Sequence, residues 1–594
     1  MFKRNDKHKQ ADLFGASAFL NPDKQERLEN SSGGCFYRLI FCNIAEEDFA
    51  VLYSKKSSAP NAPINCMISA LLLMQKHAWT YAQLFEQIDF NLETRMALGL
   101  RDLDTQPFTE PTLFNFKRRL NDYQIKTGEN LFEQLFNRLT RQQVRELQLK
   151  TGIQRTDSVL LNSNIRSYSR LELVVEVLLR LYRHLSAQEQ ADYAGQLSDY
   201  IGQNGQQYVR RIKPGEQMAH LEKLGQLYHL LYTALHHRYQ NNKAFSVFAR
   251  VYEEHFSVLE TPPDAAAGNG GKRIAVKPNE ALGSGSLQSP DDTEATYREK
   301  NGEQYQGYVA LVTETCHPDN PLQLITDIST QANHTDDAKL LHSRIDQLKD
   351  KTPDLEELHH DGGMGSAAND IKLEQQGITP IQTAIKGTTA KAPMTISCQP
   401  SAHTDTETTS SYTVQCANEQ HPAVIADKPS KNHRAVFDLS ICAKCPFYEL
   451  CPTRSSRKHT KGIAVYRFTP EDYLRQQRHR NIATLPPERQ KLRPNVEATI
   501  AQMRKGEKRT GKLPVRGLLN TSLYGIAMSI IINFGRIFRY QGVKSGKNSV
   551  FRLFLPSNFR ELLTQLFLQY TLSIFNCNIP ISFLPNQPKL QRVF

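Results

Sequence analysis

The chain has 594 residues, of which 39% are hydrophobic and 23% are charged. This composition is typical of a soluble globular protein with several domains, and it excludes a single small binding module, a disordered chain and a fibrous protein. The formal net charge is +12, and fourteen Lys and Arg against Glu497 and Glu507 between residues 489 and 552 account for all of it. So basic a segment indicates a polyanionic partner, with double-stranded DNA ahead of a merely solvated basic face.

The sequence predicts neither secretion nor a membrane span. Its first ten residues lack the apolar run of a signal peptide, and Asn and Ser interrupt its most apolar stretch, residues 518–534. That stretch is therefore expected to be a buried helix. Ten Cys without a secretion signal favour a reducing, cytoplasmic location over a disulfide framework.

Helical spacing of apolar residues predicts an all-helical N-terminal unit over residues 1–150. Thr109 is expected to cap a helix in which Lys117, Arg118 and Arg119 form a basic turn. Such a turn fits a DNA contact of the helix-turn-helix kind. Its commoner role is compensation of the helix dipole at a helix end.

The pattern then changes several times along the chain. A β-like run at 151–165 contains Asp157, helices are expected over 166–260, and a segment rich in Ala, Gly, Ser and Pro at 261–295 predicts a flexible linker. Strands are expected at 307–313, 322–329, 355–360 and 378–385, with helices at 336–348 and 366–376. This order predicts an α/β fold with a mixed sheet.

The last part of the chain predicts an interruption followed by two more helices. Residues 387–488 are polar, hold five of the ten Cys and look like an insertion. Helices are expected at 489–504 and 515–540, and the tail 541–594 has no assigned role. A catalytic core would then comprise 151–165, 296–386 and 489–540.

Three acidic residues occupy positions suited to chemistry. Asp157 lies in the first strand, Asp361 follows the fourth, and Glu497 lies on the helix after the insertion. Carboxylates so placed can converge on two divalent cations, which stabilise the attacking and leaving oxygens of a phosphoryl transfer. Taken singly, each acid also has an ordinary explanation: the end of a strand, the start of a turn, or a pair with Arg493.

Cations surround the last of these acids. Glu497 is flanked by Arg493, Arg504 and Lys505, and Lys508 and Arg509 follow three and four residues after Lys505. We expect these side chains to bind DNA phosphates.

Several short blocks in order carry a family resemblance. They are Gln154–Ser158, Gly307–Leu311, Ile325–Ile328, Asn333–Asp336, His360–Ser366 and Val496–Ile500. With these blocks the chain resembles bacterial insertion-sequence transposases that carry a DDE triad on an RNase H-like core. The nearest group is that typified by insertion sequence eleven-eighty-two, related to the four/five-type insertion sequences.

In that family the glutamate helix carries the signature Tyr-(2)-Arg-(3)-Glu-(6)-Lys. Here the corresponding residues are Gln490, Arg493, Glu497 and Arg504. Arginine in the last position keeps the phosphate-binding charge, whereas the tyrosine is replaced by glutamine.

The resemblance implies that Asp157, Asp361 and Glu497 bind Mg²⁺ or Mn²⁺ as two ions. It implies cleavage at the transposon terminal inverted repeats, strand transfer into target DNA, a homo-oligomeric synaptic complex and a place at the bacterial nucleoid. The alternatives are a zinc-containing DNA-binding protein without catalysis and a metal-dependent nuclease on the same core.

The cysteine cluster in the insertion predicts a structural zinc site. Cys442 and Cys445 have the two-residue spacing of a zinc loop, and Cys451 follows. Cys416 is the best fourth ligand for Zn²⁺, with His433, His459 and Cys398 as further candidates. Reduced thiols without a metal are the alternative.

Overall fold

The computed structural model describes residues 1–9, 15, 19–56, 59–260, 272–383, 385, 394–399, 411–426, 432–453 and 462–544. The chain forms two units, Met1–Arg536 and Ile537–Phe594. The second unit is described only as far as residue 544, so most of the tail 541–594 lies outside the described residues.

The N-terminal unit is helical. Its helices are α1 (Pro22–Glu29), α2 (Ser32–Leu39), α3 (Ile64–His77), α4 (Tyr81–Phe90), α5 (Leu92–Ala97), α6 (Glu110–Thr127) and α7 (Leu131–Glu146), with short 3₁₀ turns η1 (Lys7–Lys9), η3 (Phe41–Asn43) and η4 (Glu46–Leu52). Local signals set the boundaries: Thr80 and Gln83 form a capping box at the start of α4, and α6 begins after Thr109. The Thr109 hydroxyl bonds Thr112 rather than a backbone N–H.

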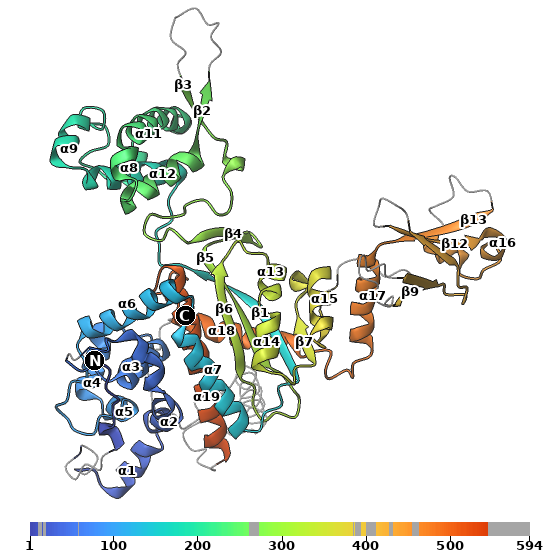
Figure 1. Cartoon of the computed structure of the whole chain (residues 1–594), viewed down its shortest axis with the longest axis horizontal. Coiled ribbons are helices and arrows are strands. Elements are labelled where there is room, and N and C mark those ends of the chain that lie inside the picture. Colours follow the sequence, from blue (N-terminus) through green and yellow to red (C-terminus); the bar gives the residue numbers. More distant parts are fainter. Residues whose placement is uncertain are drawn as a thin grey trace, which may run out of the picture. The chain divides into compact units, whose positions relative to one another are not determined.

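A six-stranded mixed sheet forms the centre of the fold (Figure 1). Its strands are β1 (Ile153–Asn162), β4 (Thr296–Lys300), β5 (Glu303–Thr315), β6 (Ile325–Ala332), β7 (Glu357–His360) and β8 (Thr379–Gln382). The order is β4-β5-β1-β7-β8, and β6 also pairs with β5. β1, β4 and β6 are each antiparallel to β5, whereas β1, β7 and β8 run parallel to one another.

Short helices cover this sheet. α13 (Asp337–His342), α14 (Ile345–Lys351) and α15 (Ala367–Gln375) bury an apolar core that includes Leu311, Leu341, Leu358 and Leu373. The single helix expected at 336–348 is thus two helices. The break comes at Arg344, which reaches back to β6, where its guanidinium pairs with the fully buried Asp327.

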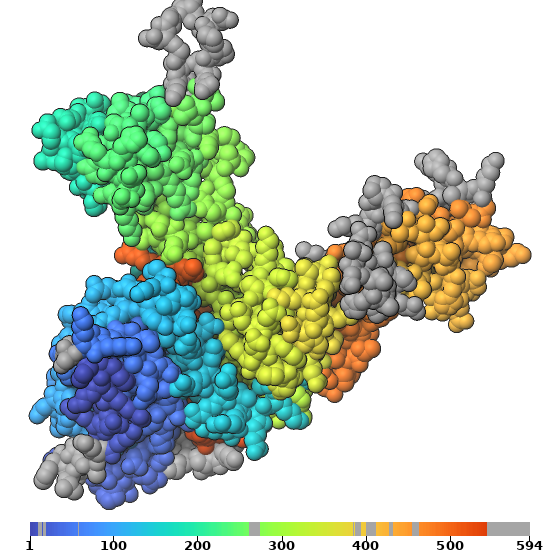
Figure 2. All heavy atoms as spheres, in the orientation of Figure 1, coloured from blue at the N-terminus to red at the C-terminus, as the bar shows by residue number. Residues whose placement is uncertain are grey.

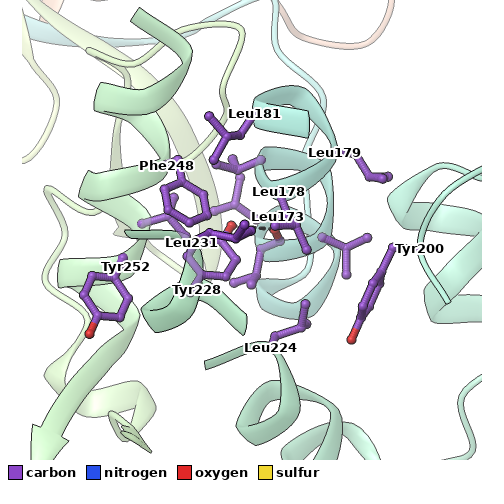
Figure 3. Close-up of a cluster of buried hydrophobic side chains, with 14 of the residues drawn as sticks. Leu173, Leu178, Leu179, Leu181, Tyr200, Leu224, Tyr228, Leu231, Phe248 and Tyr252 are labelled. Carbon is purple, nitrogen blue, oxygen red and sulfur yellow. Dashed lines mark hydrogen bonds between the residues drawn. The ribbon is translucent and has the colours of Figure 1, made fainter. Parts of the chain in front are cut away.

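A helical insertion follows β1. It consists of α8 (Arg170–His184), α9 (Ala187–Tyr193), α10 (Gly205–Arg210), α11 (Gln217–Tyr239) and α12 (Lys243–His255), and it is the compact green body of Figure 2. Figure 3 shows its core, in which Tyr228 and Phe248 stack with ring centroids 4.3 Å apart. The Tyr228 hydroxyl donates to the Val174 carbonyl at 2.7 Å, so this buried polar group is satisfied.

The prediction of a flexible linker at 261–295 is wrong for its described part. β3 (Lys272–Val276) pairs antiparallel with β2 (Phe256–Glu260). Farther on, Asp292 is buried and accepts hydrogen bonds from Ser163, Tyr308 and Gly517. The Ala- and Gly-rich residues that suggested a linker, 261–271, lie outside the described residues.

The polar segment 387–488 forms small sheets separate from the central one. β9 (Thr395–Gln399) pairs with β10 (Ser411–Gln415), and β11 (Ala423–Ala426), β12 (His433–Asp438) and β13 (Ile463–Phe468) form a second sheet. The short helices α16 (Leu439–Cys442) and η7 (Tyr448–Leu450) lie between β12 and β13. α17 (Pro470–Ala483) then returns to the core, where the Arg478 side chain pairs with Asp370 on α15.

The helix expected at 489–504 is shorter than predicted. A 3₁₀ turn, η9 (Arg493–Asn495), precedes α18 (Val496–Met503). Pro494 explains this boundary, because proline lacks an N–H and disfavours helical geometry in the residue before it. Glu497 consequently lies in the first turn of α18.

The last described helix, α19 (Leu518–Lys544), is long and apolar enough to cross a membrane by length and composition. However, 72% of the apolar window is buried within the protein. Asn533 also ties the helix to β6, because its side chain bonds both the N–H and the carbonyl of Ile325. α19 therefore packs as a core helix, as the sequence predicted.

Candidate functional site

The register of the central sheet brings Asp157 and Asp361 together. β1 and β7 are parallel, and Arg155 lies opposite His359. The two strands run in the same direction. The residues two positions farther on, Asp157 and Asp361, therefore lie next to each other at the end of the β1–β7 ladder. Asp157 is still within its strand and buried, whereas Asp361 has just left its strand and is 40% exposed.

Glu497 completes the group from the opposite side. A single atom, Arg493 Nη2, lies 2.6 Å from Asp157 Oδ2, 3.6 Å from Glu497 Oε1 and 4.0 Å from Asp361 Oδ1. A strand, a loop and a helix far apart in the sequence thus direct three carboxylates at one cation.

The environment of these acids is unequal. Burial raises the pKa of Asp157, and the nearby charges of Glu497 and Asp361 act in the same direction. The Arg493 guanidinium and the Ser158 N–H, which donates to Asp157 Oδ1 at 2.8 Å, oppose the shift. The carboxylate on the strand is therefore costly to ionise unless a cation accompanies it.

A buried network beneath the acids was missed in the sequence. Glu314 on β5 is fully buried and accepts hydrogen bonds from Arg155 on β1 at 2.7 Å, from Thr499 on α18 at 2.7 Å and from Arg536 on α19 at 2.8 Å. Arg155 also donates to the Leu492 carbonyl at 2.8 Å. These bonds fix the start of α18 against the sheet, and with it the direction of Glu497.

A polar cavity of about 610 Å³ opens beside Asp361. Its lining includes Gly362, Gly363, Gly365, Ser366, Arg298, Asp337, Gln382, Arg475 and Arg478. A Cβ at Gly365 would overlap the terminal amide of Gln382, so a larger residue there would require this side chain to shift. The glycines after Asp361 therefore line an open space, as expected where a ligand backbone must approach closely.

The two other acidic landmarks of the sequence have structural roles. Asp327 is fully buried. Burial raises its pKa, but Arg344 and Lys351 outweigh this effect and hold the pKa below its usual range. The same two cations pair with Glu133 on α7, joining the N-terminal helices to the core. Asp336 caps α13 by accepting a bond from the Ala338 N–H.

The basic residues after Glu497 differ in exposure. Lys505, Lys508 and Arg509 are exposed, and Lys508 reaches Asn164 at 3.2 Å. Arg504 is half-buried, and it donates to the Leu160 carbonyl at 3.3 Å and lies 3.8 Å from Glu507. The exposed members of this set are free to meet a phosphate backbone, whereas Arg504 is tied to β1.

The N-terminal basic turn lies in the middle of α6, not at its end. The dipole explanation is therefore wrong, because the macrodipole acts only within a terminal turn. Lys117 turns inward, where its ammonium donates to the Tyr81 hydroxyl at 3.3 Å and burial lowers its pKa. Arg118 and Arg119 are exposed, with Arg119 lying over the Tyr53 ring.

The four cysteines proposed as zinc ligands line one small, apolar cavity. They are Cys416, Cys442, Cys445 and Cys451, with Met394, Phe437 and Phe447 around them. The Gln420 N–H donates to Cys416 Sγ at 3.3 Å, and the Cys451 thiol lies 3.2 Å from the Thr453 hydroxyl. Burial raises the pKa of the Cys442 thiol, and the other three cysteines raise it further.

The alternative fourth ligands are not part of this cavity. His433 stacks on Phe468, Cys398 lies on β9, and His459 falls outside the described residues. Within the described part of the chain, no group of three or more His, Cys, Asp or Glu side chains stands at metal-binding spacing. This holds for the cysteines and for the three carboxylates around Arg493.

Comparison with known proteins identifies part of the chain. Residues 415–538 match a family described as Transposase DDE domain. The matched segment contains the four cysteines, Arg493 and Glu497. It includes only the first two residues of the unit Ile537–Phe594. Asp157 and Asp361 lie outside it. No curated protein and no solved structure matches the chain. The match supports a DDE transposase, an enzyme of the nuclease and transposase kind that acts on DNA.

Proposed function

We propose that the chain is a metal-dependent DNA transposase that cuts at the ends of its element and joins those ends to target DNA. The observation that carries this proposal is the convergence of Asp157, Asp361 and Glu497 on one cationic group. The transposase family match at residues 415–538, which contains Glu497, supports it independently.

The chemistry of this donor set fits Mg²⁺ or Mn²⁺. Hard divalent cations prefer carboxylate oxygens, and the three acids already surround a positive charge, the Arg493 guanidinium. Asp157, Asp361 and Glu497 are the residues that would hold the metal. Bound in this place, two divalent ions would activate water or a 3′-hydroxyl and stabilise the attacking and leaving oxygens of the phosphoryl transfer.

The remaining tasks belong to the protein. The Ser158 N–H orients the Asp157 carboxylate, and the Glu314 network holds α18 so that Glu497 faces it. The open cavity beside Asp361 admits the DNA backbone. Exposed Lys505, Lys508 and Arg509 bind phosphates on either side. No covalent protein nucleophile is needed.

We further propose that the catalytic core is RNase H-like and belongs with the insertion sequence eleven-eighty-two group. Apart from the edge strand β4, which precedes β5, the elements of the central sheet follow in the order β1, β5, β6, α13–α14, β7, α15, β8. This order of strand, strand, strand, helix, strand, helix, strand supports the proposal. The change from antiparallel to parallel pairing at β1 is compatible with such a core. Terminal inverted repeats, target DNA and further copies of the chain are the proposed partners.

A structural zinc ion in the insertion is a separate part of this proposal. Four thiols around one cavity in a small, cysteine-rich body, with a backbone N–H directed at Cys416, form a donor set of the kind that binds Zn²⁺. Elemental analysis of purified protein should give one zinc per chain. Cys445→Ser should lose it and Cys42→Ser, at an exposed cysteine elsewhere, should keep it. Equal zinc content in both variants, or none in the wild type, would reject the site.

The activity is tested with DNA that carries the element's own ends, in Mg²⁺. Wild type should give cut and joined products, and Asp361→Asn should give neither while still binding the ends. Cutting without joining would assign a nuclease instead. Binding without cutting in wild type, from a folded preparation, would favour a non-catalytic DNA-binding protein.

A further inference from the structure

We infer that Arg493 occupies the place of a divalent cation among the three carboxylates and must leave it when metal binds, so that metal binding and phosphate binding are coupled through this side chain. This inference rests on the proposed function, because it takes the three carboxylates as metal ligands. It adds a competing role for a residue that the sequence suggested only as a DNA contact.

The geometry is that of a bound cation. One guanidinium nitrogen reaches all three acids, and the shortest contact, 2.6 Å to Asp157 Oδ2, is a charge-assisted hydrogen bond. Arg493 and Asp157 are both largely buried, with 18% and 11% of their side chains exposed. Nothing else among the described residues forms an ion pair with these three carboxylates.

The arginine is incompletely satisfied in this position. Its Nε is buried and has no hydrogen-bond partner among the described residues. A guanidinium has five donors in a fixed fork and usually engages several of them. The unused donor indicates that the present arrangement leaves binding capacity for a different acceptor, such as a phosphate oxygen.

The backbone favours movement of the side chain alone. Arg155 bonds the carbonyl of the preceding residue, Leu492, and Pro494 restricts the chain directly after it. The Cα of Arg493 is therefore held, while the long side chain can rotate about its own bonds. A displaced guanidinium stays within one side-chain length of the site.

Charge repulsion prevents the Arg493 guanidinium and a divalent metal ion from occupying the site together. A divalent ion and a guanidinium a few ångströms apart repel strongly at the low effective dielectric of a partly buried site. Three carboxylates without any cation would repel one another as well. Arg493 thus offsets part of the negative charge of the site before metal binds and opposes metal until it moves.

DNA supplies the acceptor for the displaced arginine. A phosphate next to the site would bind the guanidinium in a bidentate, charge-assisted manner. Because coupling between two ligands is reciprocal, DNA should strengthen metal binding and metal should strengthen DNA binding. The site would then be fully assembled only when both are present.

The test is Mn²⁺ binding to the full chain without DNA, followed by electron paramagnetic resonance of free Mn²⁺. We expect Arg493→Gln to bind Mn²⁺ about ten-fold or more tightly than wild type, because a competing charge is removed. Lys491→Gln is the matched control: it removes one exposed positive charge two residues from Arg493 that forms no ion pair with the acids, and its affinity should equal that of wild type.

A second variant and a second measurement show whether the change in Mn²⁺ affinity comes from the arginine itself rather than from a misfolded Arg493→Gln protein. Arg493→Lys retains the charge but lacks the planar fork, so its Mn²⁺ affinity should lie between those of wild type and Arg493→Gln. A DNA duplex carrying an element end should tighten Mn²⁺ binding in wild type and in Lys491→Gln. This effect should be lost in Arg493→Gln.

The failures are distinguishable. Should Arg493→Gln and Arg493→Lys bind Mn²⁺ no more tightly than wild type, while Asp361→Asn loses it, the arginine only organises the acids and the inference is overturned with the proposed function intact. Absence of Mn²⁺ binding in wild type and all variants would overturn the proposed metal site, and this inference with it.

Discussion

Replacing Glu314 with Gln should destabilise the sheet and misdirect Glu497. Glu314 is fully buried and is the shared acceptor for Arg155, Thr499 and Arg536. Glutamine has nearly the same volume but one acceptor oxygen, and its amide N–H₂ would face donors.

The magnitude follows from the two arginines. Arg155 and Arg536 have only 7% and 13% of their side chains exposed, and both would lose their buried counter-charge. Removing one partner of a buried ion pair costs about 3–5 kcal/mol, because the remaining charge is left uncompensated. Glu303→Gln on the same strand is the control. Glu303 is exposed, so its replacement should change stability by less than about 0.5 kcal/mol.

Hydrogen exchange of the β5 amides measures the opening free energy of this strand directly. Glu314→Gln should lower it by the amount above and should also reduce DNA cleavage, since α18 loses its attachment to the sheet. The view that this network supports the site would be refuted if Glu314→Gln lowered the opening free energy by less than about 1 kcal/mol, with no clear difference from Glu303→Gln.

Three further predictions concern catalysis, pH and salt. Asp361→Asn should abolish cleavage in a gel assay yet leave end binding, measured by anisotropy, within about two-fold, because it removes no phosphate contact; retained strand transfer would remove Asp361 from the site. Burial, with Arg170 and Lys277, lowers the pKa of His255 to about 4. The unfolded chain takes up this proton near pH 6.5, so stability is complete above that pH and falls by about 3 kcal/mol towards pH 4. Urea unfolding should show this loss in wild type and in the exposed control His237→Gln. In His255→Gln the loss should be smaller by about 3 kcal/mol, with the remainder due to other groups such as His77 and His360, whose pKa values are also lowered to about 4. Lys508→Gln should reduce the salt dependence of DNA binding by about one phosphate contact, and an unchanged slope in a salt titration would place Lys508 outside the DNA surface.

Local pattern alone predicted most of the elements. Alternating and apolar runs predicted the strands around Asp157 and before Asp361, because buried strands require such residues whatever their partners are. The helical insertion was predicted in the same way from its three-to-four spacing. Pro494 already contained the signal that the helix expected at 489–504 begins only after it, although helical spacing on both sides obscured this signal.

Composition gave the wrong prediction at 261–295, where a short strand follows residues rich in Ala and Gly. The strand Lys272–Val276 was hidden by the Ala- and Gly-rich residues before it. It is held by pairing with Phe256–Glu260 and by Ile274, which is buried in the core of the helical insertion. Strand pairing depends on the partner, so a five-residue run by itself carries little signal. The same reason hid Glu314, whose neighbours Arg155 and Arg536 are far from it in sequence.

The sequence by itself determined which residues could do chemistry: three acids at strand and helix ends, a basic segment after the last, and four cysteines in one polar insertion. Only the tertiary structure decided how they meet. The β1–β7 register sets Asp157 beside Asp361, and Arg493, visible in the sequence only as a neighbour of Glu497, becomes the shared cation of all three acids. Periodicity reports the burial of each residue in its own element, whereas register and packing between distant elements are settled by the free energy of the whole fold.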